Sequence, residues 1–161
     1  MELVGGFEGK SKTYFEVYRV RGDSWKSVVP ELNEIETEAF KLPKGRMEKL
    51  SNYRVLDSAD FCLIVKPKGD NKIVAYIWGK GKDTTFHMKH SAVRSNYQRQ
   101  GIGTQLKTQL IDQLKKDAVY SKIYVHAINN ISATINEQVG FVKKYPFSYK
   151  DQTTWVMTKD L

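Results

Sequence analysis

The sequence predicts an α+β fold in which a central, mostly antiparallel sheet is flanked by helices. Short runs of β-branched and aromatic residues recur along the chain, and amphipathic segments lie between them. Three strand candidates in the middle of the chain follow one another through short connections, which implies antiparallel pairing. A strand, a helix and a further strand come next, which implies a parallel crossover. The expected sheet is therefore mixed.

The N-terminal third is expected to form one strand and two helices. Residues 13–21 (TYFEVYRVR) are rich in β-branched and aromatic residues and predict a strand that ends at Gly22. A helix follows, with Pro30 in its first turn. Its apolar positions recur at helical spacing: Val28, Leu32, Ile35 and Ala39. Residues 46–53 are expected to form a short second helix.

The remaining elements follow from the same two periodicities. The strand candidates are residues 61–66, 72–78, 84–93, 122–128, 141–149 and 153–158. A helix after the third of these carries an apolar face made by Ile102, Leu106, Leu110, Ile111 and Leu114. A shorter helix over residues 132–138 is expected to end at Gly140, a natural C-terminal capping position.

Length and composition indicate a globular protein with a basic surface. The 161 residues are expected to form a single domain, 1–161. A net charge of +8 favours anionic partners such as nucleic acid, a membrane surface or a phosphorylated small molecule, but scattered lysines fit a solvated surface equally well. Cys62 is the only cysteine, so a reducing, cytoplasmic location is expected. No apolar run is long enough to span a membrane, and no membrane partner is expected.

Residues 96–106 (NYQRQGIGTQL) place two glycines at the start of an amphipathic helix. A glycine inside a helix costs roughly 1 kcal/mol relative to alanine, so a bare turn must serve some purpose. Free backbone N–H groups at a helix N-terminus bind anions, most often phosphate. The stretch matches neither the dinucleotide fingerprint nor the P-loop, because Leu106 stands where a third glycine is needed and no lysine follows in register.

The pattern Gln98-x-x-Gly101-x-Gly103 after a strand resembles the acetyl-CoA motif of the GNAT N-acetyltransferase superfamily, Q/R-x-x-G-x-G/A. Residues 129–141 (NNISATINEQVGF) resemble the second motif of that family, N-x-x-[AS]-x-x-L-Y-E-K-x-G-F. The resemblance implies the GNAT fold, with the sheet splayed between its fourth and fifth predicted strands, residues 84–93 and 122–128. It also implies an enzyme that transfers an acetyl group from acetyl-CoA to an amine.

The resemblance further assigns acetyl-CoA, as a co-substrate and without a metal, to a set of residues in the two motifs. They are Ala92 and Val93 at the strand end, Gln98, Arg99, Gln100, Gly101, Ile102, Gly103 and Thr104 in the turn, and Asn129 and Asn136 in the second motif. Arg99 and Lys107 are near enough in sequence to contact the phosphates, although a solvated surface position suits Lys107 equally well. Asn129 could also cap the next helix, and the two roles could coexist.

Acetyl transfer to an amine requires a base, and the departing thiolate can require an acid. His87 lies eleven residues before Gln98, the position of the catalytic residue in the family, and is the expected base. Regular alternation places His90 on the opposite face, unless a β-bulge reverses it. His126 lies on the next strand. Asn136 replaces the family's usual acidic tyrosine, which leaves Tyr124 and Tyr145 as candidate acids.

The expected function is direct transfer of an acetyl group to a primary amine on a small molecule or a peptide, by a monomer or a homodimer. Glu34, Glu36 and Glu38 could attract a cationic amine or form a solvated helix face, and Tyr76 and Trp78 could line the acceptor site or the core. A non-catalytic acyl-CoA sensor is the alternative. A nucleic-acid-binding module is disfavoured because it leaves the glycine turn unexplained.

Overall fold

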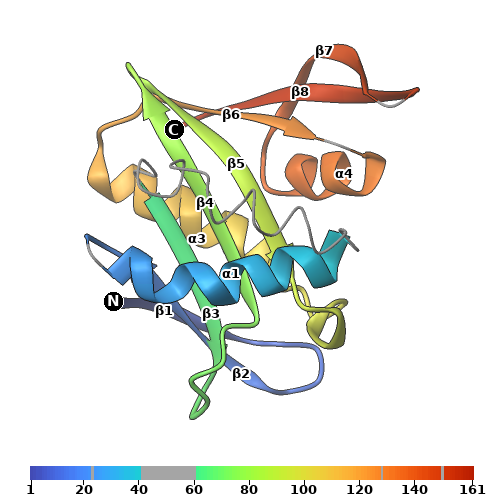
Figure 1. Ribbon diagram of the computed structural model, residues 1–161. Coiled ribbons are helices and arrows are strands. Elements are labelled where there is room, and N and C mark those ends of the chain that lie inside the picture. The colour runs from blue at the N-terminus through green and yellow to red at the C-terminus, as the bar shows by residue number, and fades with distance from the viewer. Residues whose placement is uncertain (23, 41–60, 128, 150) are drawn as a thin grey trace.

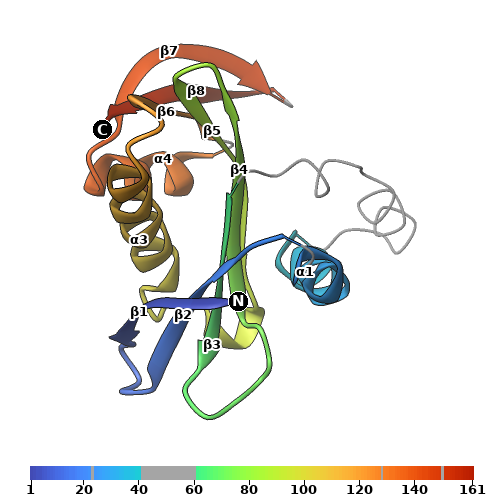
Figure 2. The ribbon, with the colours of Figure 1, turned by 90° about the vertical axis from the view of Figure 1, so that its left-hand side faces the viewer.

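A single mixed sheet of eight strands forms the centre of the computed structural model, which describes residues 1–22, 24–40, 61–127, 129–149 and 151–161 (Figure 1). The strands lie in the order β1-β2-β3-β4-β5-β6-β8-β7. Helix α1 covers one face, and helices α3 and α4 cover the other (Figure 2). The predicted α+β fold is confirmed. The short helix expected at residues 46–53 falls outside the described residues.

The strands and helices occupy most of the predicted segments. The strands are β1 (Glu2–Glu8), β2 (Tyr14–Val20), β3 (Phe61–Pro67), β4 (Ala75–Lys82), β5 (Thr85–Val93), β6 (Lys122–Ala127), β7 (Val142–Tyr149) and β8 (Gln152–Asp160). The helices are α1 (Ser24–Phe40), α3 (Ile102–Asp117), α4 (Asn130–Gln138) and a short 3-10 helix, η1 (Ser95–Tyr97). Gly140 has the left-handed conformation, with φ of 98°, immediately after the end of α4.

Three sequence expectations about these elements are corrected by the structure. Strand β1 was not predicted, because Gly5 and Gly6 interrupt its β-branched pattern. A Cβ at Gly5 would lie 2.6 Å from Gln109 Oε1, so the bare backbone here admits the side chain of α3. Strand β4 begins three residues later than expected. Pro30 lies inside α1 rather than in its first turn, because the helix starts at Ser24.

The core consists of two apolar layers, one on each face of the sheet. Between the sheet and α3 lies the larger layer, to which Phe86, Leu106 and Leu110 contribute fully buried side chains. Between the sheet and α1 lies a smaller layer that includes Leu32 and Ile35. The apolar faces predicted for both helices are therefore the faces that they bury, which removes apolar area from water on both sides of the sheet.

The parallel pair β5–β6 runs together over only part of its length (Figure 1). Residues 85–88 of β5 pair with residues 122–125 of β6, ending at Met88 and Val125. Beyond this point β5 continues to Val93 along β4, whereas β6 continues to Ala127 along β8. We call the place where the two strands part the fork. The expected splay between these two strands is confirmed.

Candidate active site

The glycine turn connects the end of β5 to α3 and is held in place by two glutamine side chains. Gln98 Nε2 donates to the carbonyl of Val93 at 3.2 Å, and Gln100 Oε1 accepts from the backbone N–H of Ser11 at 2.8 Å. Arg99 and Gly101 adopt the left-handed region, with φ of 65° and 82°. Gln98 thus fixes the start of the turn to the strand that borders the fork, and Gln100 fixes it to the β1–β2 connection.

The first turn of α3 presents backbone N–H groups that no side chain of the described residues caps. Gly101 is the residue before the helix and makes no capping hydrogen bond, and the first turn contains no acidic residue. The N–H groups of Ile102, Gly103 and Thr104 are therefore available to an anion, and the helix dipole favours negative charge there. Arg99 is exposed beside them.

Gly103 has no packing reason to be a glycine. A Cβ built at this position meets no atom within 4 Å, and its backbone is not in the left-handed region. Gly101 differs, because its φ of 82° by itself favours glycine. Among the described residues, nothing therefore requires a glycine at this position, and the space beside its backbone is open to a ligand.

The second motif leads from β6 into α4, on the other side of the fork. Asn129 Oδ1 accepts from the N–H of Ser132 at 2.8 Å, so its side chain caps α4. Asn136 is fully buried, and its Nδ2 lies 3.7 Å from Met157 Sδ. Its Oδ1 accepts from Lys107 Nζ at 2.5 Å.

The position of Lys107 corrects both sequence expectations for that residue. Its side chain is neither solvated nor free to reach the glycine turn, because only 5% of the residue is exposed and its Nζ is bonded to Asn136. Burial lowers the pKa of Lys107 from 10.5 to about 8. Lys107 precedes Leu110 by three residues and Ile111 by four, so helical spacing was the signal in the sequence that could have placed it on the buried face of α3.

A β-bulge in β5 brings His87 and His90 to the same face of the sheet. Trp78 pairs with His90 and Gly79 pairs with Met88, so Lys89 is the extra residue. Simple alternation predicted opposite faces and is wrong for this pair. The bulge that the sequence analysis named as the alternative is present.

His87 belongs to an aromatic cluster that spans the paired part of β5 and β6. Its ring centroid lies 4.9 Å from that of Tyr124, which it faces across the parallel pair. The Tyr124 hydroxyl forms a 2.5 Å hydrogen bond with His126 Nε2 and a further hydrogen bond with Tyr145. The structure therefore brings together the expected base and both candidate acids.

The electrostatics of this cluster favour a neutral base and disfavour Tyr124 as an acid. Burial, with the nearby charges of Lys89 and Lys82 and with His126, lowers the pKa of His87 below its usual 6.5. Burial and the hydrogen bond to Tyr145 raise the pKa of Tyr124 to about 12, so that its hydroxyl keeps its proton. His87 is thus unprotonated and able to accept a proton at neutral pH.

His90 is held by a buried carboxylate that sequence reasoning did not assign to it. Glu36 Oε1 lies 3.1 Å from His90 Nδ1, and Glu36 Oε2 accepts from the Tyr76 hydroxyl at 2.8 Å. The ring of His90 stacks on Trp78 at a centroid distance of 5.3 Å. Tyr76 and Trp78 are buried, 1% and 6% exposed, and therefore belong to the core.

The acidic residues of α1 are engaged by the protein itself. Glu34 and Glu38 each lie 3.3 Å from the guanidinium of Arg94, which is buried at the end of β5. Glu36 binds Tyr76 and His90 as described. This arrangement fixes α1 to the strand that borders the fork, and the expectation that these carboxylates form a free cation-attracting face is not supported.

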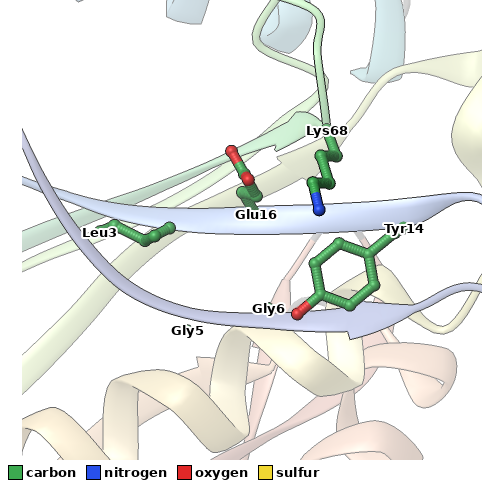
Figure 3. A pocket seen from close by; sticks show the side chains of 6 residues that line it. All are labelled: Leu3, Gly5, Gly6, Tyr14, Glu16 and Lys68. Carbon is green, nitrogen blue, oxygen red and sulfur yellow. The ribbon is translucent and has the colours of Figure 1, made fainter.

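A surface hollow elsewhere on the sheet has no part in this site. Figure 3 shows that it is lined by Leu3, Gly5, Gly6, Tyr14, Glu16 and Lys68. These residues lie on or next to β1 and β2, several strands from the fork in the sheet order. Among the described residues, no group of three or more His, Cys, Asp or Glu could hold a metal ion. In the same part of the chain, no helix is long and apolar enough to cross a membrane.

The fork and the glycine turn beside it agree with the class of protein that the family comparison gives, an acetyltransferase. The model of the acetyltransferase (GNAT) family matches residues 25–141. The chain therefore belongs to the GNAT family, and the expectation of an N-acetyltransferase enzyme is confirmed. A comparison with curated proteins gives no match.

Solved structures with the same fold include two ribosomal-protein acetyltransferases. The ribosomal-protein-S18-alanine N-acetyltransferase of Escherichia coli has a TM-score of 0.71 at 21% identity, covering 91% of this chain and 93% of that chain. The ribosomal-protein-S5-alanine acetyltransferase of Vibrio fischeri has a TM-score of 0.64 at 19% identity, covering 97% and 96%. The PaiA N-acetyltransferase of Thermoplasma acidophilum, in complex with coenzyme A, has a TM-score of 0.69 at 14% identity, covering 90% and 99%.

Proposed function

We propose that this protein is an acetyl-CoA-dependent N-acetyltransferase that moves an acetyl group directly to a primary amine. The observation that carries the proposal is Gly103, a helical glycine at which an added Cβ would meet no described atom within 4 Å, beside a helix N-terminus without a side-chain cap. Family membership supports the same function, and so does the coenzyme A complex of the PaiA structure with this fold.

Acetyl-CoA would supply an activated acetyl group as a thioester. The N–H groups of Ile102, Gly103 and Thr104 would bind its diphosphate, with Arg99 adding positive charge. Ala92 and Val93 lie on the part of β5 that has left β6, so their backbone has polar groups available on the side of the fork. A backbone N–H of β5 close to the fork would stabilise the oxyanion, because the thioester carbonyl is bonded to the sulfur.

His87 would take the proton that the attacking amine loses, directly or through a water molecule. Its lowered pKa keeps the imidazole unprotonated at neutral pH, which is the form that accepts a proton. Tyr124 packs against the imidazole at 4.9 Å and would hold its orientation. Tyr145, on β7, is hydrogen-bonded to Tyr124. Its side chain is exposed, which supports a role in contacting the acceptor.

The acceptor would be a primary amine on a small molecule or a peptide. Two proteins with this fold are alanine acetyltransferases of ribosomal proteins, so peptides with an N-terminal alanine belong in any panel of acceptors. A panel of such peptides, polyamines and arylalkylamines, assayed by thiol release from acetyl-CoA, would identify the acceptor class. Binding of coenzyme A without turnover of any amine would instead favour the sensor alternative.

Gly103→Val tests the assignment of the turn. The new side chain would occupy the space in front of the N–H groups, so affinity for coenzyme A, measured by calorimetry, should fall at least about 100-fold while the unfolding midpoint is kept. Thr108→Val, one turn further along α3 and exposed, is the matched control and should bind normally. Unchanged affinity in Gly103→Val would refute the turn assignment. Gly101 is less suitable, since its φ of 82° strains any other residue.

We also propose that residues 1–161 act as one catalytic domain in the cytoplasm. Strand β1 pairs with β2, and β8 pairs with β6 at the fork, so both ends of the chain contribute to the same sheet. Cys62 is free and fully buried, which fits a reducing compartment. The molar mass in solution, measured by light scattering, would distinguish a monomer from a homodimer.

A further inference from the structure

Lys107 is a buried cation whose partner is a neutral amide. Its Nζ donates to Asn136 Oδ1, and burial is the cause of its lowered pKa, with no charged side chain among the described residues contributing. A buried ammonium ordinarily requires a negative partner, because transfer of an isolated charge out of water is costly. An anion brought by a ligand would meet this need.

The Lys107–Asn136 hydrogen bond joins α3 to α4, the two helices that cover the same face of the sheet (Figure 2). Asn136 Nδ2 contacts Met157, which pairs with Val125 in the antiparallel β6–β8 ladder. Val125 in turn pairs with Met88, the last residue of β5 that meets β6. The register thus connects Lys107 to the point where the two strands part.

The length of β5 sets how far this point is from the glycine turn. From Val93 back to Met88 the strand spans about 17 Å at roughly 3.3 Å per residue. An extended pantetheine arm has a similar length. A donor whose diphosphate is bound at the turn and whose arm follows β5 would therefore bring its sulfur to the fork, next to the ammonium group.

Asn136 occupies the position at which the second motif leads one to expect a tyrosine that protonates the thiolate. An amide cannot give up a proton at neutral pH, but it can hold a group that does. A phenol is absent from this position, and a buried lysine is bonded to the residue that replaces it. The residue that replaces the expected tyrosine, Asn136, is therefore in direct contact with a group that can donate a proton, Lys107 Nζ.

Building on the proposed function, we propose that Lys107 is the catalytic acid of this enzyme and that Asn136 positions it. After the N–C bond has formed, the C–S bond breaks with its electron pair on sulfur, and Lys107 Nζ passes one proton to that sulfur. His87 takes the proton that the amine loses. Solvent then returns a proton to Lys107 and removes one from His87, so that the reaction balances.

The first test measures the pKa of the thiol of bound coenzyme A and requires no amine acceptor. The ultraviolet absorbance of the thiolate is followed against pH in complexes of the wild-type protein, Lys107→Met and the control Lys115→Met, whose lysine is exposed on the same helix. A nearby ammonium favours the thiolate, so the thiol pKa should be lower by about 1–3 units in the wild type and in Lys115→Met than in Lys107→Met.

The second test reads the pH dependence of turnover with an amine from the panel. Lys107→Met should lower kcat about 100-fold and abolish the basic limb of the kcat profile, effects that a purely structural role would not combine. Lys107→Met/Asn136→Tyr places a phenol at this position and should recover part of kcat, with the basic limb moved towards about pH 10.

The outcomes separate the two proposals. Absence of coenzyme A binding by the wild type would overturn the proposed function together with this inference. Binding with the same thiol pKa in wild type and Lys107→Met, or an unchanged basic limb in a folded Lys107→Met enzyme, would overturn the inference alone and leave the acetyltransferase function in place.

Discussion

Replacing Lys107 with methionine is expected to stabilise the ligand-free protein at neutral pH and to change the pH dependence of its stability. The cause is burial, which lowers the pKa of Lys107 from 10.5 to about 8. Between these two values the unfolded chain still carries a proton on Lys107 that the folded chain has lost. The stability of the wild type therefore rises with pH between these two values. Methionine does not titrate, so Lys107→Met lacks this pH dependence.

The magnitude follows from the size of the pKa shift. The difference between 10.5 and about 8 is about 2.5 units, and at 1.36 kcal/mol per unit it corresponds to roughly 3 kcal/mol. Loss of the hydrogen bond to Asn136 offsets about 1 kcal/mol of this gain. Lys107→Met should then be more stable than the wild type by about 2 kcal/mol near pH 7.

Urea unfolding at about pH 7 and about pH 10 measures both effects. The free energy of unfolding of the wild type should rise by about 2.5 kcal/mol relative to Lys107→Met between the two pH values. Lys115→Met, which removes an exposed lysine from the same helix, controls for net charge and should follow the wild type. If the difference in free energy of unfolding between the wild type and Lys107→Met is the same at both pH values, the Lys107 ammonium is not desolvated and the reasoning is refuted.

Other residues give predictions of the same kind. His87→Ala should lower kcat/KM about 100-fold and remove an acid limb that lies below about pH 6.5 in the wild type, and an unaltered pH–rate profile would exclude His87 as the base. Glu36→Gln should cost about 1–2 kcal/mol in urea unfolding by weakening the contact to His90, and no change would show that contact to be unimportant. Asp117→Asn should cost about 1–3 kcal/mol, because Asp117 makes a two-point ion pair with the buried Arg19. That pairing lowers the pKa of Asp117, so the wild type should lose its advantage as the pH falls below about 4, and a pH-independent difference would contradict this.

The sheet and its helices could be predicted wherever the sequence repeats at a clear period. The apolar positions of α3 recur at helical spacing, and all five predicted ones are buried. Strand β1 could not be recognised, because a strand that accommodates a helix side chain against Gly5 loses the pattern by which strands are detected. The start of β4 was misplaced because Ile73 and Val74 are apolar and buried like strand residues, although the strand begins at Ala75.

The candidate donor-binding residues could be proposed from the sequence because they act through the backbone, whereas the contacts relevant to proton transfer could not, because they depend on packing. Gly101 and Gly103 are visible in the sequence, since few other purposes explain bare positions at a helix start. The two contacts that matter for protons join residues far apart in the chain: Glu36 to His90, and Lys107 to Asn136. Neither pair has a spacing that a periodic pattern can reveal.

The two motifs identify this fold because they occupy the two chain segments that leave the fork. The glycine turn follows β5, and Asn129 follows β6, each at the point where its strand gives way to a helix on the same face. Where parallel strands stay paired, their facing backbone N–H and C=O groups bond to each other. Where β5 and β6 part, these groups are available to a ligand, between the N-termini of α3 and α4. The aromatic and histidine cluster lies on the opposite face, beside the last paired residues. In the proposed mechanism, a donor held on one face and an amine deprotonated on the other meet where β5 and β6 separate, so the extent of this pairing would determine where transfer takes place.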